Sequence, residues 1–326
     1  SYLSGEPAAE RAYRLKFNPY RQTFQRIRTL AGEGHIVDKI EMRIIGGTWS
    51  YYPKIYQQKF IAACFAAAND FGVQKFKNSE CLTPARRLPN TRSALQVLQT
   101  EQKKNETAEC RIVGISVETR PDYINPREIV HLRQLGVTRV ELGVQSVFDD
   151  VLDLNRRGHK VYHTIYATKL LKNAGFKVSY QIMLNLLGST VKRDLQMAKE
   201  LFSNPDFCPD LLKIYPLAVL KEAPLYKFYQ QGKFQPYSIN QLVALIKAIK
   251  KIVPPWVRIE RIIRDIPAKR IIGSANVSNL RQLIASDMQT QNWQCQCIRC
   301  REVKDNYNPQ EKLILTRRNY FASGGK

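Results

Sequence analysis

The sequence has no apolar run close to the roughly 20 residues that a membrane-spanning helix needs, so we expect no membrane partner. It also shows no signal peptide and no low-complexity segment. Its seven cysteines are odd in number and three of them are clustered, which is unlike a disulfide scaffold. We therefore expect a cytoplasmic protein in a reducing environment.

Acidic residues are scarce. The chain has 28 Asp and Glu and 51 Lys and Arg, which give a net charge of +23. The basic excess is spread along the whole chain and is not confined to a tail. The 326 residues are 44% hydrophobic, enough to bury a sizeable core in one large or two modest domains. Such a charge on an ordered chain points to a polyanion. Nucleic acid is the simplest candidate, and an anionic membrane surface is the rival.

The clearest fold signal lies in the run 110–146. Short apolar strands are expected at 111–117 and 139–143, and a helix over 125–135 joins them. A strand, a helix and a strand within roughly 35 residues form a βαβ unit, which requires parallel strands and a right-handed crossover.

Polar residues follow both strands of this unit. Glu118 and Arg120 come at the end of the first strand, and Gln145 and Ser146 at the end of the second. In parallel α/β sheets and barrels, ligands bind at that edge. A simple pairing of Glu118 with Arg120 would also explain the first two residues. The repetition at a second strand end favours a binding site.

Further strands are predicted at 39–45, 177–184 and 211–216, the last of which is the final clear strand, and helices alternate with them. This alternation predicts the α/β class, as a barrel or an open parallel sheet. Gly46 and Gly47 directly follow the first strand, and glycines there let the backbone approach a ligand closely. An ordinary strand-to-helix turn would look similar.

Two of the expected helices carry apolar residues at helical spacing. The helix that begins at Pro53 has four candidate core residues: Ile55, Phe60, Cys64 and Phe65. The helix expected at 161–174 has four more apolar positions: Tyr162, Ile165, Tyr166 and Leu170.

Three cysteines near the end of the chain, Cys295, Cys297 and Cys300, have the spacing C-x-C-x-x-C. Thiolates this close can share one soft or borderline cation, of which zinc is the usual one. A reduced turn without metal is the alternative, but the neighbouring arginines favour thiolate and therefore metal. Three further cysteines are candidates for a fourth ligand: Cys81, Cys110 and Cys208.

A basic stretch with an aromatic neighbour precedes these cysteines. Its basic residues, which follow Trp256, are Arg258, Arg261, Arg264, Lys269 and Arg270. Basic side chains beside an aromatic ring suit RNA backbone contacts with one stacking platform. An amphipathic segment with a solvated basic face is the plainer interpretation, and the net charge favours RNA.

Taken in order, six stretches resemble the radical S-adenosylmethionine (SAM) domain of the catalytic subunit of Elongator. They read IIGGTWSYYP, VGISVETRPDY, RVELGVQSVFDDVLDLNRRGH, LLKIYP, VPPWVRIERIIRDIP and NLRQL. Members of that family are tRNA-modifying acetyltransferases. In them a partial (β/α) barrel binds a 4Fe-4S cluster and SAM, and a separate C-terminal domain handles acetyl-CoA. The resemblance implies a radical-SAM barrel over 1–255, followed by a basic, cysteine-containing extension over 256–326 that links to an acetyltransferase domain.

The resemblance also implies a reaction and its site. A 5′-deoxyadenosyl radical would take hydrogen from an acetyl group, and the acetyl radical would add to C5 of the wobble uridine, towards 5-carboxymethyluridine. Lys39 matches a family lysine associated with acetyl-CoA. The residues implied for SAM are Gly46, Gly47, Thr48, Glu118, Arg120, Gln145, Lys213 and Tyr215. Each alone could be an ordinary strand-end polar group, and the set is what favours a site.

Two departures from the family pattern limit these expectations. The family's cluster cysteines precede the segment that reads SYLSGEPAAERA here, and its acetyltransferase domain follows RRNYFASGGK. We therefore expect this chain to lack both and to be inactive alone. The three clustered cysteines are a poor match for cluster ligands, because they follow the barrel strands. The expected function is the tRNA-binding part of an Elongator-type transferase, with Elongator-type subunits or a second copy as partners. The alternative is a non-catalytic RNA-binding domain that keeps the barrel fold.

Overall fold

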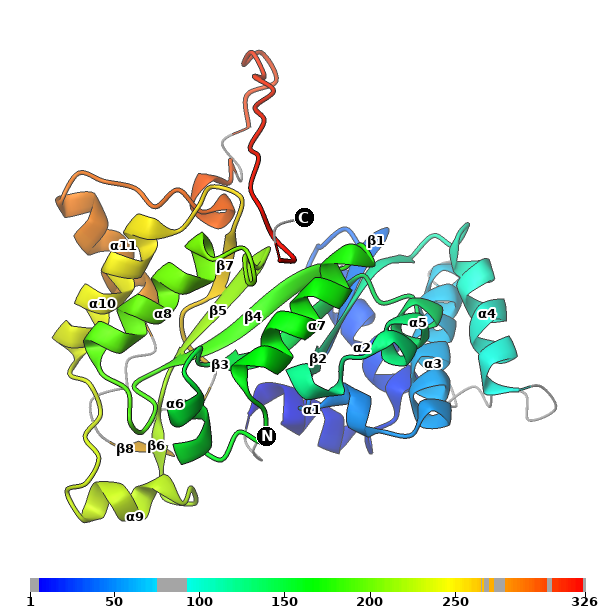
Figure 1. Ribbon diagram of the computed structural model, residues 1–326. Helices are drawn as coiled ribbons and strands as arrows, with labels where there is room; N and C mark the ends of the chain where they lie inside the picture. The colour runs from blue at the N-terminus through cyan, green and yellow to red at the C-terminus, as the bar shows by residue number, and fades with distance from the viewer. Residues whose placement is uncertain are drawn as a thin grey trace. The chain divides into compact units, whose positions relative to one another are not determined.

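The chain folds into two compact units (Figure 1). Unit 1 consists of Ser1–Thr119 and Pro126–Val140, and unit 2 of Arg120–Asn125 and Glu141–Lys326. This computed structural model describes residues 6–74, 93–264, 266, 270–272, 279–303 and 307–324.

Unit 1 combines helices with two paired strands. Along the chain it contains α1 (Pro7–Arg14), α2 (Pro19–Gly32), β1 (Lys39–Ile44), the 3-10 helix η1 (Trp49–Tyr51), α3 (Lys54–Gln74), α4 (Ala94–Asn105), β2 (Arg111–Thr119) and α5 (Pro126–Gln134). β1 and β2 pair in parallel, from Lys39 opposite Arg111 to Ile44 opposite Val117. A buried cluster from α2, α3 and the strand entries forms part of its core: Ile27, Val37, Ala68, Phe71 and Cys110.

Local sequence signals set where the helices of unit 1 begin. The Asn18 side chain accepts a hydrogen bond from the backbone N–H of Arg21 (3.0 Å), and Pro19 occupies the first helical position of α2. At α4, Ser93 and Gln96 form a reciprocal capping box.

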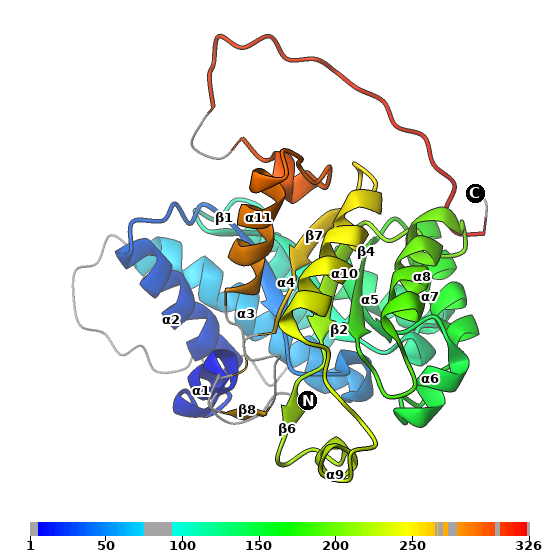
Figure 2. The same ribbon diagram turned by 90° about the vertical axis from the view of Figure 1, so that its left-hand side faces the viewer.

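Unit 2 repeats the alternation of strands and helices. It contains η2 (Pro121–Tyr123), most of β3 (Arg139–Gln145), α6 (Asp149–Leu154), α7 (Val161–Asn173), β4 (Lys177–Leu184), α8 (Val191–Ser203), β5 (Leu211–Pro216), β6 (Val219–Leu220), α9 (Leu225–Gln230), α10 (Ile239–Ile252), β7 (Arg258–Arg261), β8 (Ile271–Ile272), α11 (Leu280–Thr290) and η4 (Ile298–Arg301). β5 pairs in parallel with β4 on one side and β7 on the other. α10 packs against both α8 and α11 (Figures 1 and 2).

The strand order is β1-β2-β3-β4-β5-β7, an open order of the kind that a partial barrel has. Parallel pairs alternating with helices confirm the predicted α/β class. The expectation that 211–216 is the last clear strand was wrong, because β7 adds a further one. β7 has only four residues, RIER, two of them arginines, so it lacks a readable apolar pattern. The division into 1–255 and 256–326 stays a prediction.

Among the described residues, no helix is both long enough and apolar enough to cross a membrane.

α7 turns a different face to the core from the one that its apolar spacing suggested. Tyr162 and Tyr166 are exposed, whereas Thr164 and Thr168 are fully buried. The Thr168 hydroxyl contacts the hydroxyl of the buried Tyr180 on β4. A buried phenol needs a polar partner, and the threonine face of α7 supplies one.

The last described segment, 307–324, forms neither helix nor strand and runs extended from unit 2 (Figure 1). We call it the strap. Its middle is exposed, with Leu315 wholly so. Near its end, Tyr320 stacks on Trp256 with ring centroids 4.5 Å apart and planes within 2°. The backbone N–H of Gly324 donates to the carbonyl of Pro205 (3.2 Å), which attaches that end to unit 2.

A buried histidine joins the elements of unit 1. His131 on α5 is 3% exposed, and its Nε2 lies 3.1 Å from Oε1 of Gln57 on α3. The amide nitrogen of Gln57 donates in turn to the carbonyls of Trp49 (3.3 Å) and Tyr52 (2.8 Å). Burial, and secondarily the charge of Lys54, lowers the pKa of His131 to about 4. The imidazole is therefore neutral near neutral pH.

We expect His131 to make unit 1 sensitive to acid. An unfolded histidine titrates near pH 6.5, so below that pH the unfolded chain binds a proton that the folded chain does not bind. The free energy of unfolding therefore decreases as the pH is lowered below about 6.5. The effect on the free energy of unfolding is about 2 kcal/mol between about pH 7 and pH 5. Urea titrations at both pH values should show that His131→Gln loses less stability than the wild type by this amount. The exposed His35, changed to Gln, is the matched control. Equal losses in wild type and His131→Gln would contradict the assignment.

Candidate functional site

The turn that follows β1 is built for close approach to its backbone. Gly46 and Gly47 have φ angles of 146° and 116°, which favour glycine, and a Cβ added to either would meet no atom within 4 Å. Thr48 comes next, and its carbonyl accepts the first hydrogen bond of η1, from the N–H of Tyr51 (3.1 Å). The turn therefore presents open backbone that a small polar ligand can reach.

The end of β2 lies beside this turn within unit 1. The Thr119 hydroxyl lies 3.0 Å from the hydroxyl of Ser50 in η1. Glu118, the preceding residue, is only 8% exposed and has a polar partner of its own. The structure thus brings Gly46, Gly47 and Thr48 close to the strand end that carries Glu118, as the sequence predicted.

Lys39 stands at the other end of β1. It is exposed and lies opposite Arg111, where the strand begins. At about 3.3 Å per residue, a six-residue strand separates it from the glycine turn by roughly 20 Å. The structure therefore does not group Lys39 with the residues of unit 1 that are predicted to bind SAM, and its role with acetyl-CoA stays a prediction.

In unit 2, Arg120 is held by a dense set of contacts. Its guanidinium donates to both carboxylate oxygens of Asp122 (2.9 and 2.6 Å) and to the carbonyl of Gly158 (2.9 Å). The hydrogen bond with Asp122 is the main cause that raises the pKa of Arg120. Gly158 has a φ of 73°, which favours glycine, and a Cβ there would lie 2.9 Å from the guanidinium, so Arg120 would have to shift to make room for it. Arg120 is therefore a fixed, permanently charged group.

Two strands of unit 2 end in residues with left-handed backbone. Gln145 ends β3 with φ 67°, and Asn185 follows β4 with φ 64°. Non-glycine residues in this conformation carry strain and are frequent at functional sites. Gln145 was a predicted site residue. Asn185 was missed, although its position directly after the strand 177–184 was a usable signal.

Lys213 lies in the interior of unit 2. It is 3% exposed and forms an ion pair with Glu141 on β3, which is 1% exposed. Gln181 on the strand between them donates to the same carboxylate (3.4 Å). A buried ion pair is costly unless its polar atoms are satisfied, so these three side chains depend on one another. Tyr215, two residues beyond Lys213, is half-buried on the same face of β5.

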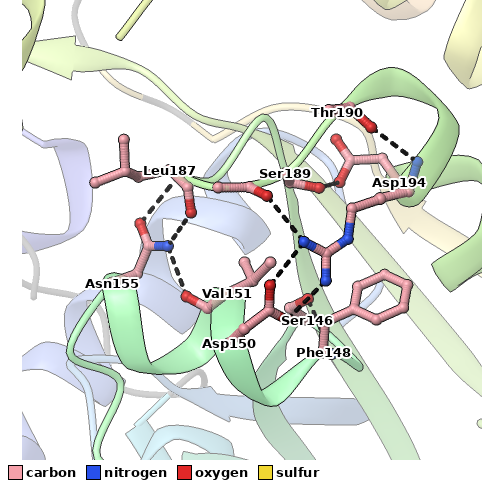
Figure 3. A network of polar contacts seen from close by, with 11 residues as sticks. Ser146, Phe148, Asp150, Val151, Asn155, Leu187, Ser189, Thr190 and Asp194 are labelled. Carbon is pink, nitrogen blue, oxygen red and sulfur yellow. Dashed lines mark hydrogen bonds and ion pairs between the residues drawn. The ribbon is translucent and has the colours of Figure 1, made fainter. Parts of the chain in front are cut away.

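The loop after β4 is fixed by a buried carboxylate (Figure 3). Asp194 is 2% exposed and accepts hydrogen bonds from the N–H of Asn185 (2.7 Å), the hydroxyl of Ser189 (2.5 Å) and the hydroxyl of Tyr237 (3.0 Å). Burial raises the pKa of Asp194, and the three donors oppose that rise. The sequence reading missed this residue, because its partners lie up to 43 positions away.

A second set of contacts in Figure 3 ties α6 to the same loop. Arg193 forms a two-pronged ion pair with Asp150 (2.6 and 2.8 Å) and donates to the carbonyl of Gly188 (3.0 Å). Asn155 donates to the carbonyls of Val151 (2.7 Å) and Leu187 (2.9 Å). The loop between β4 and α8 is therefore rigid and held from both sides.

The three clustered cysteines do come together. The sulfur atoms of Cys295, Cys297 and Cys300 all lie within 4.8 Å of one another, and the first two residues are buried. Hydrogen bonds with Cys295 and Cys300 are the main cause that lowers the pKa of Cys297, and hydrogen bonds with Cys297 and Cys300 are the main cause that raises the pKa of Cys295. Three sulfur ligands so arranged suit a soft or borderline metal ion.

The cysteine cluster is attached to β7 and α10. The Ile298 N–H donates to the Val257 carbonyl (3.0 Å), and Arg299 donates to the Glu260 carbonyl (2.9 Å). Lys250, at the end of α10, donates to the sulfur of Cys300 (3.4 Å) and places a positive charge beside the thiols.

Among the residues that the structure describes, no candidate for a fourth ligand lies in the cysteine cluster. Cys208 donates instead to the carbonyls of Phe202 (3.7 Å) and Asn204 (3.5 Å). Cys110 belongs to the hydrophobic core of unit 1. Cys81 lies outside the described residues.

The predicted RNA-binding residues lie in unit 2 and are partly neutralised. Arg258 forms an ion pair with Glu302, and Arg270 pairs with Glu222 (2.8 Å). Arg261 and Arg264 also have partners, and Lys269 lies outside the described residues. Trp256, the expected stacking platform, already stacks on Tyr320. The RNA-binding role of this set stays a prediction.

Family models cover most of the chain. The Radical SAM superfamily matches residues 9–201, and the Radical_SAM C-terminal domain matches residues 209–290. Three relatives align with the whole chain. They are the tRNA uridine(34) acetyltransferases of Methanocaldococcus infernus (43% identical) and Dehalococcoides mccartyi (36%), and Elongator complex protein 3 of Saccharomyces cerevisiae (35%). The chain spans 58%, 67% and 55% of their respective lengths.

A solved structure agrees with these matches. The archaeal Elp3 of Methanocaldococcus infernus, with its N-terminus deleted, superposes with a TM-score of 0.84 at 42% identity, over 96% of this chain and 70% of that one. The resemblance read from the sequence is thereby confirmed. The chain belongs to the radical SAM superfamily and, within it, to the family of the tRNA uridine(34) acetyltransferases and Elongator complex protein 3.

Proposed function

We propose that this chain is the radical-SAM and tRNA-binding part of a transferase that adds an acetyl-derived carboxymethyl group to C5 of the wobble uridine of tRNA. The observation that carries the proposal is the match of the whole chain to relatives named tRNA uridine(34) acetyltransferase. The proposal includes tRNA and acetyl-CoA as substrates, the cytoplasm as location, and Elongator-type subunits or a second copy as protein partners.

The proposed SAM contacts are described for each unit by itself. In unit 1, the backbone of Gly46 and Gly47 and the Thr48 hydroxyl would meet the ammonium and carboxylate of SAM, because the open turn leaves room beside them. Glu118 would accept hydrogen bonds from the ribose hydroxyls. In unit 2, the proposed contacts are Arg120, Gln145, Lys213 and Tyr215. Buried ion pairing holds Lys213 in place, and Asp122 holds Arg120.

The described cysteines do not by themselves account for a 4Fe-4S cluster, which would supply the electron that cleaves SAM. Such a cluster needs neighbouring thiolates. Cys64, Cys110 and Cys208 are buried singly, and burial raises the pKa of Cys64 to about 12, which keeps it a thiol. We propose zinc as the metal of the group formed by Cys295, Cys297 and Cys300, with Lys250 offsetting part of its negative charge. A non-catalytic RNA-binding domain that keeps the barrel fold is the second candidate function.

The first test concerns zinc. Elemental analysis of protein purified without added metal should find about one zinc per chain, because three sulfur ligands converge at Cys295, Cys297 and Cys300. Cys297→Ser should lose most of the metal, whereas Cys208→Ser, a buried cysteine outside the group, should retain it. A metal-free protein with three titratable thiols in this loop would rule the site out.

The second test concerns SAM. In the whole protein, purified anaerobically, Gly47→Ala should weaken SAM binding by about fivefold to about 150-fold, because a side chain at a φ of 116° strains the turn by roughly 1–3 kcal/mol. Gly32→Ala is the matched control, since that glycine closes α2 away from the turn. Calorimetry measures both affinities. Unchanged affinity in Gly47→Ala would remove the turn from the SAM site, and no SAM binding by the wild type would favour the non-catalytic function.

The third test concerns tRNA. Each phosphate neutralised contributes a slope of about −0.7 in log affinity against log salt, for single-strand-like contacts. With about five phosphates engaged, a fourfold rise in salt should weaken tRNA binding roughly a hundredfold. Filter binding across a salt series, with duplex DNA of equal length as the control ligand, measures this. Salt-independent binding, or equal affinity for the DNA, would contradict specific tRNA binding. The net charge of +23 would then indicate only a generic basic surface.

A further inference from the structure

The segment that ends α1 and enters α2 exposes two aromatic rings. We call residues 11–21 the α1 tip, which lies in unit 1 (Figure 2). Tyr13 is 72% exposed and Phe17 is 62% exposed, although both are large and apolar. Their ring centroids are 6.5 Å apart at an interplanar angle of 82°. α1 has no buried residue, so these rings are not needed to attach it to a core.

The backbone holds the rings outward. Lys16 and Phe17 are consecutive non-glycine residues with left-handed backbone, at φ 51° and 53°. The turn is closed by hydrogen bonds from the N–H of Phe17 to the carbonyl of Ala12 (2.7 Å) and from the N–H of Lys16 to the carbonyl of Tyr13 (2.9 Å). The side chain of Phe17 is therefore placed beside that of Tyr13 by the main chain.

The charge of the α1 tip is positive and uncompensated. It contains four basic residues and no acidic one: Arg11, Arg14, Lys16 and Arg21. All four are exposed, and none forms an ion pair with any residue that the structure describes. In the basic stretch of unit 2, by contrast, Arg258 and Arg270 are paired with carboxylates. The α1 tip therefore offers a stronger attraction per side chain for a polyanion.

Exposed aromatic rings interleaved with exposed basic side chains fit one class of ligand. A base of a single-stranded nucleic acid stacks on an aromatic ring, worth about 1–3 kcal/mol per base, while its phosphates meet the basic side chains. A double helix keeps its bases stacked inside and cannot use the rings in this way. Because the backbone of single-stranded RNA carries one negative charge per phosphate, the match in charge is direct.

We propose that the α1 tip binds a single-stranded stretch of RNA, with Tyr13 and Phe17 as stacking platforms and the four basic residues as phosphate contacts. The proposal rests on the proposed function, in which tRNA is the substrate. It adds that the α1 tip binds a single-stranded loop of that RNA. A tRNA presents such a stretch in its anticodon loop, next to the wobble uridine.

The test measures binding of an anticodon stem-loop RNA to the whole protein across a salt series. Tyr13→Ala with Phe17→Ala should weaken binding at least about tenfold and leave the salt slope unchanged, because stacking releases no counterions. Changing the four basic residues to Gln should instead flatten the slope by about 3, at roughly 0.7 for each phosphate contact. The matched control removes four exposed lysines from unit 2: Lys169, Lys192, Lys199 and Lys227. It should leave both affinity and slope close to the wild type.

The outcomes separate this proposal from the proposed function. Wild-type binding that neither α1-tip variant changes would overturn the role of the α1 tip and leave tRNA as the substrate. A wild type that does not bind the stem-loop or tRNA would overturn both. Equal loss of affinity for a fully duplex RNA in the ring variant would exclude stacking on loop bases. Binding of anionic vesicles that the variants abolish, without RNA binding, would reassign the surface to a membrane. Ultraviolet crosslinks from 4-thiouridine in the loop should map to residues 11–21.

Discussion

Parallel pairing of the strands is the constraint on which the rest of the molecule depends. Two parallel strands cannot be joined by a tight turn, so each connection must be long enough to return to the starting edge, and here helices fill those connections. A second effect is that the carboxyl ends of paired strands meet. The glycine turn after β1 and the end of β2 are neighbours in unit 1 for this reason.

Much of the fold could be predicted because its signals are local. Strand 177–184 and strand 211–216 were predicted at their observed bounds, since apolar runs flanked by turn residues mark them. The buried face of a helix was harder to predict than the helix itself. Ile55 was a candidate core residue and is 63% exposed, whereas its neighbour Gln57 is buried. Which face of a helix is covered depends on what packs against it, and that information lies elsewhere in the chain.

In the candidate site, too, features with local sequence signals were predicted, and features that depend on distant residues were not. The glycine turn, the strand-end residue Gln145 and the cysteine cluster have signals confined to a few positions, and the sequence located them. Glu141 was missed because it looks like a lone acid in a strand until Lys213, 72 positions away, is known to be its partner. The RNA-binding role of the basic stretch after Trp256 stays a prediction for the opposite reason. Its charges are countable from sequence, but the carboxylates that pair with them are not.

The stack of Tyr320 on Trp256 attaches the strap to unit 2 a second time, near its far end. A segment attached at one end frays and is lost once it is cut, whereas this one is fastened again near residue 324 by the stack and by the bond from Gly324 to Pro205. After a single protease nick in its exposed middle, the part beyond the cut would be held to unit 2 only by such noncovalent contacts.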